Sequence, residues 1–170
     1  MIWRLIILSV CVVVWATTLL TNTGVTDGKV LNYTNQDDMV CLAKNIYWEA
    51  RNESTAGRIA VAWTVINRVN NERFPDSICG VVQQAIRYGN GFPKRNKCQF
   101  SWYCDGRADT VTNLHGWRDS YRLASYVSNG RDHLLDITDG SLWYHASYVQ
   151  PKWAKHKKKT AQIDTHIFYR

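Results

Sequence analysis

An uncharged segment near the start of the chain constrains its fold more than any other feature. Residues 5–26 contain no Asp, Glu, Lys or Arg, and the strongly apolar run from Leu5 to Leu20 follows a single positive charge at Arg4. A positive charge before an apolar run is typical of an export signal or a membrane anchor. The run has no polar face, which argues against a buried core helix. We therefore predict a signal peptide or signal anchor over residues 1–24.

The same segment divides the chain into an export signal and one domain. The apolar run is short for a bilayer span of about 20 residues, but no cleavage site of the A-x-A kind follows it, so we favour an anchor in the inner membrane. Residues 25–36 are polar and are predicted to be a linker. Residues 37–170 remain as a single domain on the periplasmic or outer side. Of all 170 residues, 45% are hydrophobic and 12% aromatic, which excludes a disordered chain.

Four cysteines fall in the predicted exported part, at Cys41, Cys79, Cys98 and Cys104. An even number in an exported domain permits two disulfides with three possible pairings, and the last two cysteines are close enough to close a small loop. Reduced, buried cysteines are the alternative. No C-x-x-C occurs, and the five histidines form no tight ligand pair, so we predict neither a metal nor a cofactor.

Hydrophobic spacing predicts a mainly helical α+β domain with one core and a small sheet. Asp37 or Asp38 can cap a first helix, and Ser54 or Thr55 can cap a second. Residues 87–113 are predicted to be a long irregular region, of the kind that is usually functional. The predicted helices cover residues 39–50, 59–69, 78–86 and 117–129, and the predicted strands cover residues 141–145 and 163–169.

Glutamate is scarce, with only Glu49, Glu53 and Glu72 beside eleven aspartates. Glu49 follows Tyr47 and Trp48 near the end of the first predicted helix, where apolar neighbours would raise a carboxyl pKa. A carboxyl of that kind suits a general acid, and cleavage of a glycosidic bond needs such an acid. Position alone also fits an ordinary surface glutamate. Glu53 could be a second carboxylate at a binding site, or a capping or salt-bridge group.

The end of the chain is basic, and the net charge of the whole chain is +7. A cluster formed by Lys152, Lys155 and residues 157–159 is predicted to be a solvated loop that could meet an anionic polymer or lipid head groups. Nucleic acid is a poor partner for an exported domain. Two aromatic stretches could stack on sugar rings or belong to the core, namely Trp102-Tyr103 and Trp143-Tyr144.

Four stretches resemble the cell wall hydrolase family that includes the spore cortex-lytic (SleB-type) enzymes. They occur in the family's order from about residue 38 to residue 170, and they are CLAKNIYWEARNESTAGRIAVAWTVINRV, FPDSICGVV, CQFSWYCDG and WYHASYVQPKWAKHKKKTAQIDTHIFYR. The resemblance implies a lysozyme-like or lytic-transglycosylase-like α+β fold. It also implies that Glu49 in YWEAR is the catalytic acid. The substrate-binding candidates are Glu53, Gln99, Ser101, Tyr144 and His145.

The resemblance implies cleavage between N-acetylmuramic acid and N-acetylglucosamine in peptidoglycan. A single glutamate suits a lytic transglycosylase, in which a hydroxyl of the sugar replaces water and leaves a 1,6-anhydro end. The alternatives are a hydrolytic muramidase, a metal-dependent amidase or peptidase, and a non-catalytic wall-binding module. We expect a monomer that lyses or remodels the cell wall. A small lytic enzyme with its own amino-terminal anchor resembles the signal-anchored endolysins of bacteriophages.

Four positions depart from the family pattern. Asn52 stands in place of the usual Gly and Ser54 in place of Pro, and both are plausible turn or cap residues. Arg58 stands in place of Gln, and Asp164 in place of Gly. Because the last two alter charge, we expect them to change substrate preference rather than the proposed acid.

Overall fold

The computed structural model describes residues 36–130 and 133–170 of the chain. The predicted signal or anchor over residues 1–24 lies outside the described residues, as does all of the predicted linker except Gln36. Within the two described ranges, no helix is both long and apolar enough to cross a membrane.

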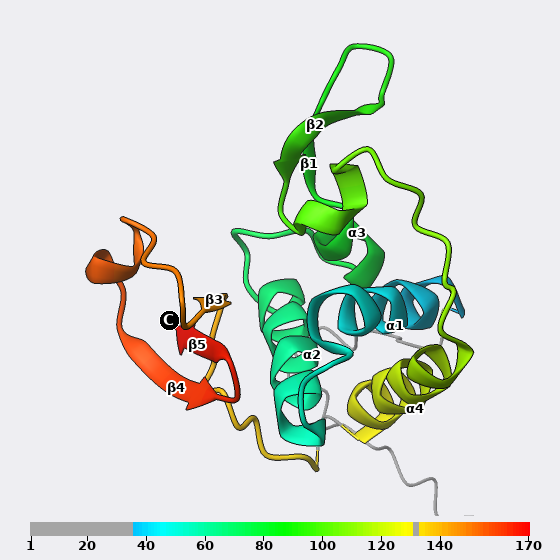
Figure 1. The fold of residues 1–170 in the computed structure, drawn as a ribbon. Coiled ribbons are helices and arrows are strands. Elements are labelled where there is room, and N and C mark those ends of the chain that lie inside the picture. Colours follow the sequence, from blue (N-terminus) through cyan, green and yellow to red (C-terminus); the bar gives the residue numbers. More distant parts are fainter. Residues whose placement is uncertain (1–35, 131–132) are drawn as a thin grey trace, which may run out of the picture. The chain divides into compact units, whose positions relative to one another are not determined.

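Four α-helices make up the main body of the described residues (Figure 1). They are α1 (Gln36–Ala50), α2 (Thr55–Val69), α3 (Ile78–Val82) and α4 (Leu114–Gly130). Helix α1 packs against the other three, and fully buried side chains such as Leu42, Ile46, Ile66 and Val127 form the core between them. The helices predicted over residues 39–50, 59–69 and 117–129 are confirmed, because each has an apolar stripe that this core covers.

The predicted helix caps have different outcomes. Ser54 is the N-cap of α2, and its side-chain oxygen accepts a hydrogen bond from the Gly57 amide at 3.3 Å, as the sequence predicted. Asp38 instead lies inside α1, and its carboxylate accepts the Cys79 amide of α3 at 2.8 Å. The first amides of any helix lack partners within that helix, so a carboxylate from a neighbouring helix can serve them as well as a local cap.

Residues 85–98 form a hairpin rather than the predicted mixture of helix and irregular chain. Helix α3 ends at Val82, and the antiparallel strands β1 (Ala85–Arg87) and β2 (Pro93–Cys98) follow. A short 3-10 helix, η1 (Ser101–Cys104), comes next. The predicted helix over residues 78–86 was therefore wrong beyond Val82. Its last residues pair with a strand that lies further along the chain, and apolar spacing alone does not reveal that partner.

The carboxyl-terminal sheet has three antiparallel strands in the order β3–β5–β4. They are β3 (Trp143–Ala146), β4 (Lys159–Ile163) and β5 (His166–Tyr169), and a 3-10 helix η2 (Ala154–His156) precedes β4. The strand predicted over residues 163–169 is confirmed at β5 but is interrupted before it, since Ile163 ends β4 and Asp164, with a positive φ of 49°, lies in the turn between the two strands. Strand β4 was missed because its lysine-rich approach suggested a solvated loop, yet Lys157 Nζ lies 3.2 Å from the centre of the Trp143 ring.

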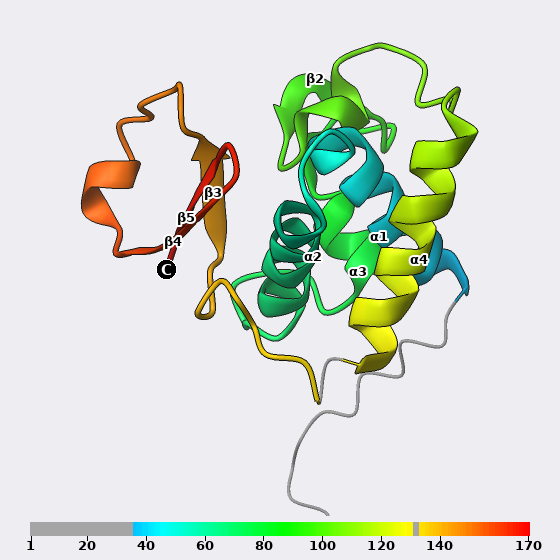
Figure 2. The same ribbon diagram turned by 60° about the horizontal axis from the view of Figure 1, so that its bottom comes forward.

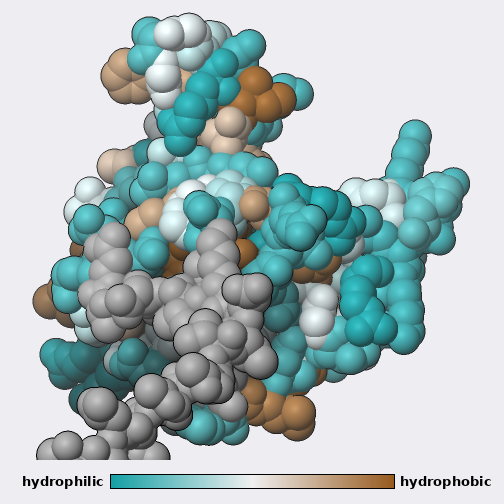
Figure 3. Space-filling view, turned by 180° about the vertical axis from the view of Figure 1, so that it is seen from behind, coloured by the Kyte–Doolittle hydropathy of each residue, from teal (hydrophilic) through white to brown (hydrophobic). Residues whose placement is uncertain are grey.

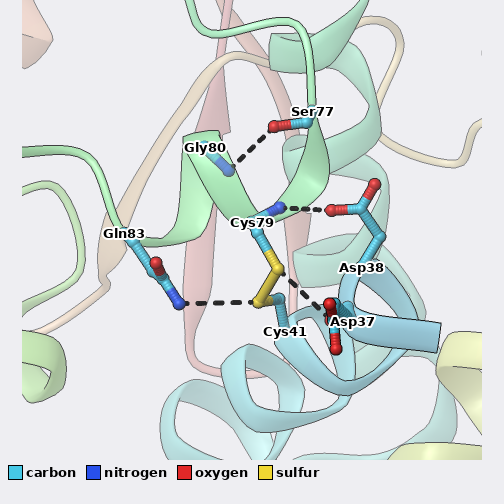
Figure 4. The surroundings of a disulfide bond; sticks show 7 residues. All are labelled: Asp37, Asp38, Cys41, Ser77, Cys79, Gly80 and Gln83. Carbon is cyan, nitrogen blue, oxygen red and sulfur yellow. Dashed lines mark hydrogen bonds between the residues drawn. A yellow bond between two sulfur atoms is a disulfide. The ribbon is translucent and has the colours of Figure 1, made fainter. Parts of the chain in front are cut away.

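The structure selects one of the three possible disulfide pairings. Cys41–Cys79 joins α1 to α3, and Cys98–Cys104 joins the end of β2 to η1. Figure 4 shows the first bond beside the start of α3, where the Ser77 side chain accepts the Gly80 amide. The alternative of reduced cysteines is therefore wrong for all four.

Polar contacts connect α2 to the segment that leads into β3. Thr64 Oγ1 and Ser141 Oγ are hydrogen-bonded at 2.9 Å, and Asn67 Nδ2 donates to the Ser141 carbonyl at 3.2 Å. Arg68 Nε donates to the Leu142 carbonyl at 2.7 Å. Figure 2 shows the sheet beside α2, on the side away from α4. These bonds fix where β3 begins relative to the helices, and so they fix the side chains that β3 presents.

Candidate active site

Four of the predicted site residues line one cavity of about 550 Å³. Glu49 comes from the last turn of α1, Ser101 from η1, and Tyr144 and His145 from β3. The cavity thus collects four predicted residues that lie up to 96 positions apart in the sequence. The helical body supplies one wall and the sheet supplies another.

Glu49 has the environment that its sequence position suggested. Its side chain is half-buried, and Oε2 accepts a hydrogen bond from the Tyr144 hydroxyl at 3.1 Å. Burial raises the pKa of the Glu49 carboxyl above its ordinary value, while the Tyr144 hydrogen bond and the positive charge of Arg68 act in the opposite direction. A carboxyl with a raised pKa keeps its proton closer to neutral pH, as a general acid requires.

Tyr144 is held as a hydrogen-bond donor to that carboxyl. Burial, followed by the charge of Glu49, raises the pKa of the Tyr144 hydroxyl well above its ordinary value. The ring lies edge-on against His166 with centroids 5.1 Å apart, and it also contacts Phe168 at 5.5 Å. The phenol therefore stays protonated, and the sheet fixes its direction.

Arg68 is a buried cation behind the site that the sequence analysis missed. Its side chain is 2% exposed, and the guanidinium lies over the rings of Phe100 at 5.1 Å and Phe74 at 5.5 Å. Burial lowers the pKa of Arg68 to about 10, so it remains charged at neutral pH. The burial of Arg68 could have been predicted from its place in α2. It follows buried Val65 by three residues and so lies on the apolar stripe that faces the core.

Several aromatic side chains are among the residues that line the cavity. Trp48 and Trp102 are stacked with centroids 6.4 Å apart and an angle of 24° between their planes, and Tyr148 is 83% exposed at the rim. Of the two predicted aromatic pairs, only Trp102 and Tyr144 line this space. Trp143 is instead covered by Lys157. Flat, partly apolar rings of this kind suit the faces of sugar rings.

The two histidines at the cavity differ in their partners. Nδ1 of His145 bonds the Ala146 carbonyl and Nε2 bonds the Tyr169 hydroxyl, each at 2.9 Å, so both ring nitrogens are engaged. His166 is 7% exposed, and Nδ1 has no hydrogen-bond partner among the described residues. Burial lowers the pKa of His166, which favours the neutral ring. His166 was missed because a single histidine carries no spacing signal.

Two predicted binding residues lie outside the cavity lining. The Glu53 carboxylate accepts hydrogen bonds from the amide and the hydroxyl of Thr165, at the turn between β4 and β5. Gln99 is exposed, and its backbone amide donates a hydrogen bond to the backbone carbonyl of Gln84 at 2.8 Å. In these contacts, Glu53 holds the turn between β4 and β5, and Gln99 holds the chain between β2 and η1.

Further carboxylates line the same cavity, at Asp105 and Asp109. Burial, and then the nearby charge of Asp105, raise the pKa of Asp109. Arg51 and Arg107 also line the space, so charges of both signs surround the proposed acid. Among residues 36–130 and 133–170, no group of three or more His, Cys, Asp or Glu side chains is arranged to hold a metal ion.

The two charge-altering departures from the family pattern make contacts away from the cavity lining. The Asp164 carboxylate accepts the Ser54 amide at 2.9 Å at the start of α2, where an anion is favourable. Its positive φ of 49° is a conformation that glycine adopts without strain, which fits the glycine that the family resemblance implies at this position. Arg58 Nη1 lies 3.8 Å from Asp119 of α4. Both residues thus join parts of the domain, and their predicted effect on substrate preference stays a prediction.

Comparison with known proteins gives a consistent result. The family model described as "Cell Wall Hydrolase" matches residues 52–169. The spore cortex-lytic enzyme of Bacillus cereus is 38% identical over 140 residues, which are 82% of this chain and 46% of that enzyme. The enzyme of the same name from Oceanobacillus iheyensis is 42% identical over 48 residues, which are 28% of this chain and 17% of that enzyme. The chain thus spans less than half the length of these relatives.

Solved structures agree with the sequence comparison. The catalytic domain of the germination-specific lytic transglycosylase SleB from Bacillus anthracis is 27% identical, with a TM-score of 0.61 over 83% of this chain and 100% of that one. The catalytic domain of Bacillus cereus SleB is 24% identical, with a TM-score of 0.59 over 85% of this chain and 100% of that one, and it supports the fold. The α+β fold class predicted from the sequence is confirmed. The family match over residues 52–169 shows that this chain belongs to the cell wall hydrolase family.

Proposed function

We propose that this chain cleaves the glycan strands of peptidoglycan between N-acetylmuramic acid and N-acetylglucosamine, as a lytic transglycosylase. One observation carries the proposal, namely that a half-buried Glu49 with a raised pKa accepts a hydrogen bond from Tyr144 in a cavity with aromatic walls. A glycosidic bond needs an acid at its leaving oxygen, and an aromatic cavity can hold the sugars on either side of that bond.

In the first step, the protonated Glu49 carboxyl transfers its proton to the glycosidic oxygen. The bond from that oxygen to C1 of the muramic sugar breaks, and positive charge develops on the sugar ring. The Glu49 carboxylate that results is stabilised by the Tyr144 hydroxyl and by the buried cation of Arg68. Both groups therefore favour the state that follows proton transfer.

In the second step, the Glu49 carboxylate takes the proton from the 6-hydroxyl of the same muramic sugar. The hydroxyl oxygen forms a bond to C1, which closes a 1,6-anhydro ring and returns Glu49 to its protonated form. The nucleophile belongs to the bound sugar, so it needs no separate binding step and benefits from proximity. The enzyme ends the cycle in its starting protonation state.

Several observations support this substrate and setting. The similar Bacillus anthracis structure is described as a lytic transglycosylase, and the curated relatives are described as spore cortex-lytic enzymes. Peptidoglycan lies outside the cytoplasmic membrane, so an exported enzyme that lyses or remodels the wall fits the predicted signal or anchor over residues 1–24. We further propose that the chain acts as a monomer. His145 would position its neighbours, since both of its ring nitrogens are engaged.

A hydrolytic muramidase is the second candidate, and one observation favours it. Asp105 and Asp109 line the same cavity as Glu49, so a second carboxylate is available to orient a water molecule. Mass spectrometry of products from purified peptidoglycan separates the two reactions. A transglycosylase leaves 1,6-anhydro ends, which are lighter by one water than the reducing ends that a hydrolase leaves. Reducing ends alone would overturn the transglycosylase proposal.

The catalytic assignment is tested with Glu49→Gln, which keeps the shape of the side chain but has no acidic proton. We expect the release of soluble fragments to fall by about 10²-fold to 10⁴-fold, the usual contribution of a general acid and base. Glu72→Gln is the matched control, because Glu72 is exposed and does not line the cavity. Full activity of Glu49→Gln, with thermal unfolding like the parent, would refute the assignment.

A further inference from the structure

The hairpin formed by β1 and β2 exposes an unusual amount of apolar surface. Ile86 is 58% exposed, Tyr88 is 55% exposed and Phe92 is 69% exposed, all within seven residues. Figure 3 shows hydrophobic and hydrophilic surface side by side on the lobe at the top of the view, where Figure 1 places this hairpin. Three large apolar side chains exposed this close together on one hairpin are candidates for an interaction surface, whereas a single exposed apolar residue needs no explanation.

The same hairpin is strongly basic. Residues 85–98 include four cations and no acidic residue, and the cations are Arg87, Lys94, Arg95 and Lys97. Lys94 Nζ lies 5.3 Å from the centre of the Tyr88 ring, so a cation and an aromatic face stand together. A partner that fits this surface carries negative charge and offers flat faces for stacking.

The base of the hairpin is continuous with the wall of the cavity. The disulfide Cys98–Cys104 ties the end of β2 to η1, which contributes Ser101 to the cavity lining. Arg95 Nε also donates to the carbonyl of Asp105, another lining residue, at 3.1 Å. The hairpin therefore lies close to the wall of the cavity, within reach of a long polymer that extends beyond it.

We propose that residues 85–98 form a second binding element for peptidoglycan, which holds a glycan strand outside the cavity. The anionic groups it meets are the carboxylates of the stem peptides, and the rings of Tyr88 and Phe92 meet the sugars. This inference rests on the proposed function, because it extends the same substrate beyond the cavity. An anionic membrane would offer the negative charge but no continuity with the cavity, so we favour the polymer.

The test measures binding of the full chain, in detergent, to purified insoluble sacculi by co-sedimentation. All proteins carry Glu49→Gln so that the strands stay intact. The hairpin variant Ile86→Ser, Tyr88→Ser, Phe92→Ser is expected to bind about tenfold more weakly. The matched control places three serines at exposed apolar positions elsewhere, in Leu114→Ser, Tyr126→Ser, Leu135→Ser, and should bind like the parent. Thermal unfolding checks that both variants fold.

A charge variant tests the electrostatic part. Lys94→Gln, Lys97→Gln should weaken binding at low salt, and the difference from the parent should shrink as salt rises, because exposed charges are screened. After removal of the detergent, the same proteins are also mixed with vesicles of phosphatidylglycerol and phosphatidylcholine. Unchanged binding of the hairpin variants to sacculi overturns the proposal, and so does a loss confined to the anionic vesicles.

The outcome is separable from the fate of the proposed function. A parent enzyme with Glu49 intact that releases no soluble fragments from sacculi refutes the proposed function. Equal binding of the hairpin variant and the control, with an active parent enzyme, refutes the hairpin proposal alone.

Discussion

The helical body and the three-stranded sheet are held in place by different forces. The helices surround fully buried apolar side chains such as Leu42, Ile46 and Val65, and a disulfide joins α1 to α3. The segment that leads into the sheet is instead joined to α2 through hydrogen bonds at Thr64 and Arg68. The proposed acid comes from the helical body and its hydrogen-bond donor comes from the sheet. Overall stability and the alignment of the site should therefore respond to different substitutions.

The largest expected effect on stability belongs to the helical body. Cys41→Ser, Cys79→Ser opens a loop with a sequence separation of 38, and chain entropy predicts a loss of about 4 kcal/mol in the free energy of unfolding. Cys98→Ser, Cys104→Ser opens a loop with a separation of only 6 and should cost about 2 kcal/mol. Urea unfolding measures both values. Equal losses for the two double variants would contradict the prediction that the disulfide between α1 and α3 contributes more to stability.

Arg68 lies between the two regions, and its replacement should affect both stability and chemistry. Arg68→Met leaves the buried Leu142 carbonyl without its donor, which should cost about 1–3 kcal/mol of unfolding free energy. The charge of Arg68 lowers the pKa of Glu49, so its removal should raise that pKa. Since the acid must be protonated, the basic limb of the kcat/KM profile should move to higher pH.

Arg68→Lys distinguishes charge from hydrogen bonding at that position. It keeps a cation but loses the planar group that bonds the Leu142 carbonyl. We expect the basic limb to lie nearer that of the parent than in Arg68→Met, while the loss of stability remains. Identical pH profiles for the parent and both variants would show that Arg68 acts on the fold alone.

Tyr144→Phe should have a small effect on stability and a clear effect on the pH profile. It removes one hydrogen bond, with a cost of about 0.5–1.5 kcal/mol. That bond lowers the pKa of Glu49, so its loss should move the basic limb to higher pH, in the same direction as Arg68→Met. An unchanged limb in an active variant would mean that Tyr144 does not bond the Glu49 carboxyl in solution.

Asp164→Asn should have the smallest effect, at the exposed contact between the β4–β5 turn and α2. Asparagine tolerates the positive φ but removes an anion at a helix start, which costs about 0.3–1 kcal/mol at neutral pH. The hydrogen bonds from Ser54 lower the pKa of Asp164 below the ordinary 3.8. The stabilisation is therefore present above that ordinary value and is lost as pH falls through the lowered pKa. Urea unfolding at neutral and strongly acidic pH checks this dependence.

The sequence predicted the helical body better than the sheet for a physical reason. The stripes of α1, α2 and α4 recur within each segment, so local spacing is enough to find them. Strand β1 lies at the end of an apolar stretch that also fits a helix, and strand β4 follows a lysine-rich stretch, so local spacing identified neither of them as a strand. The candidate acid Glu49 was found from scarcity, neighbours and family resemblance. Arg68 and His166 were not found, because burial of a charged or titratable side chain appears only once the elements pack.

The sequence by itself determined the apolar faces of the helices, a cap at Ser54 or Thr55 and a motif around Glu49 that resembles the family, since each depends on neighbours within a few residues. Only the tertiary structure decided the disulfide pairing and the hydrogen bond from Tyr144 to Glu49, two residues 95 positions apart. The raised pKa of the Glu49 carboxyl also depends on the tertiary structure, because desolvation requires the surrounding elements to be in place. The proposed chemistry of this chain thus depends on a local motif and on the packing of the sheet beside it.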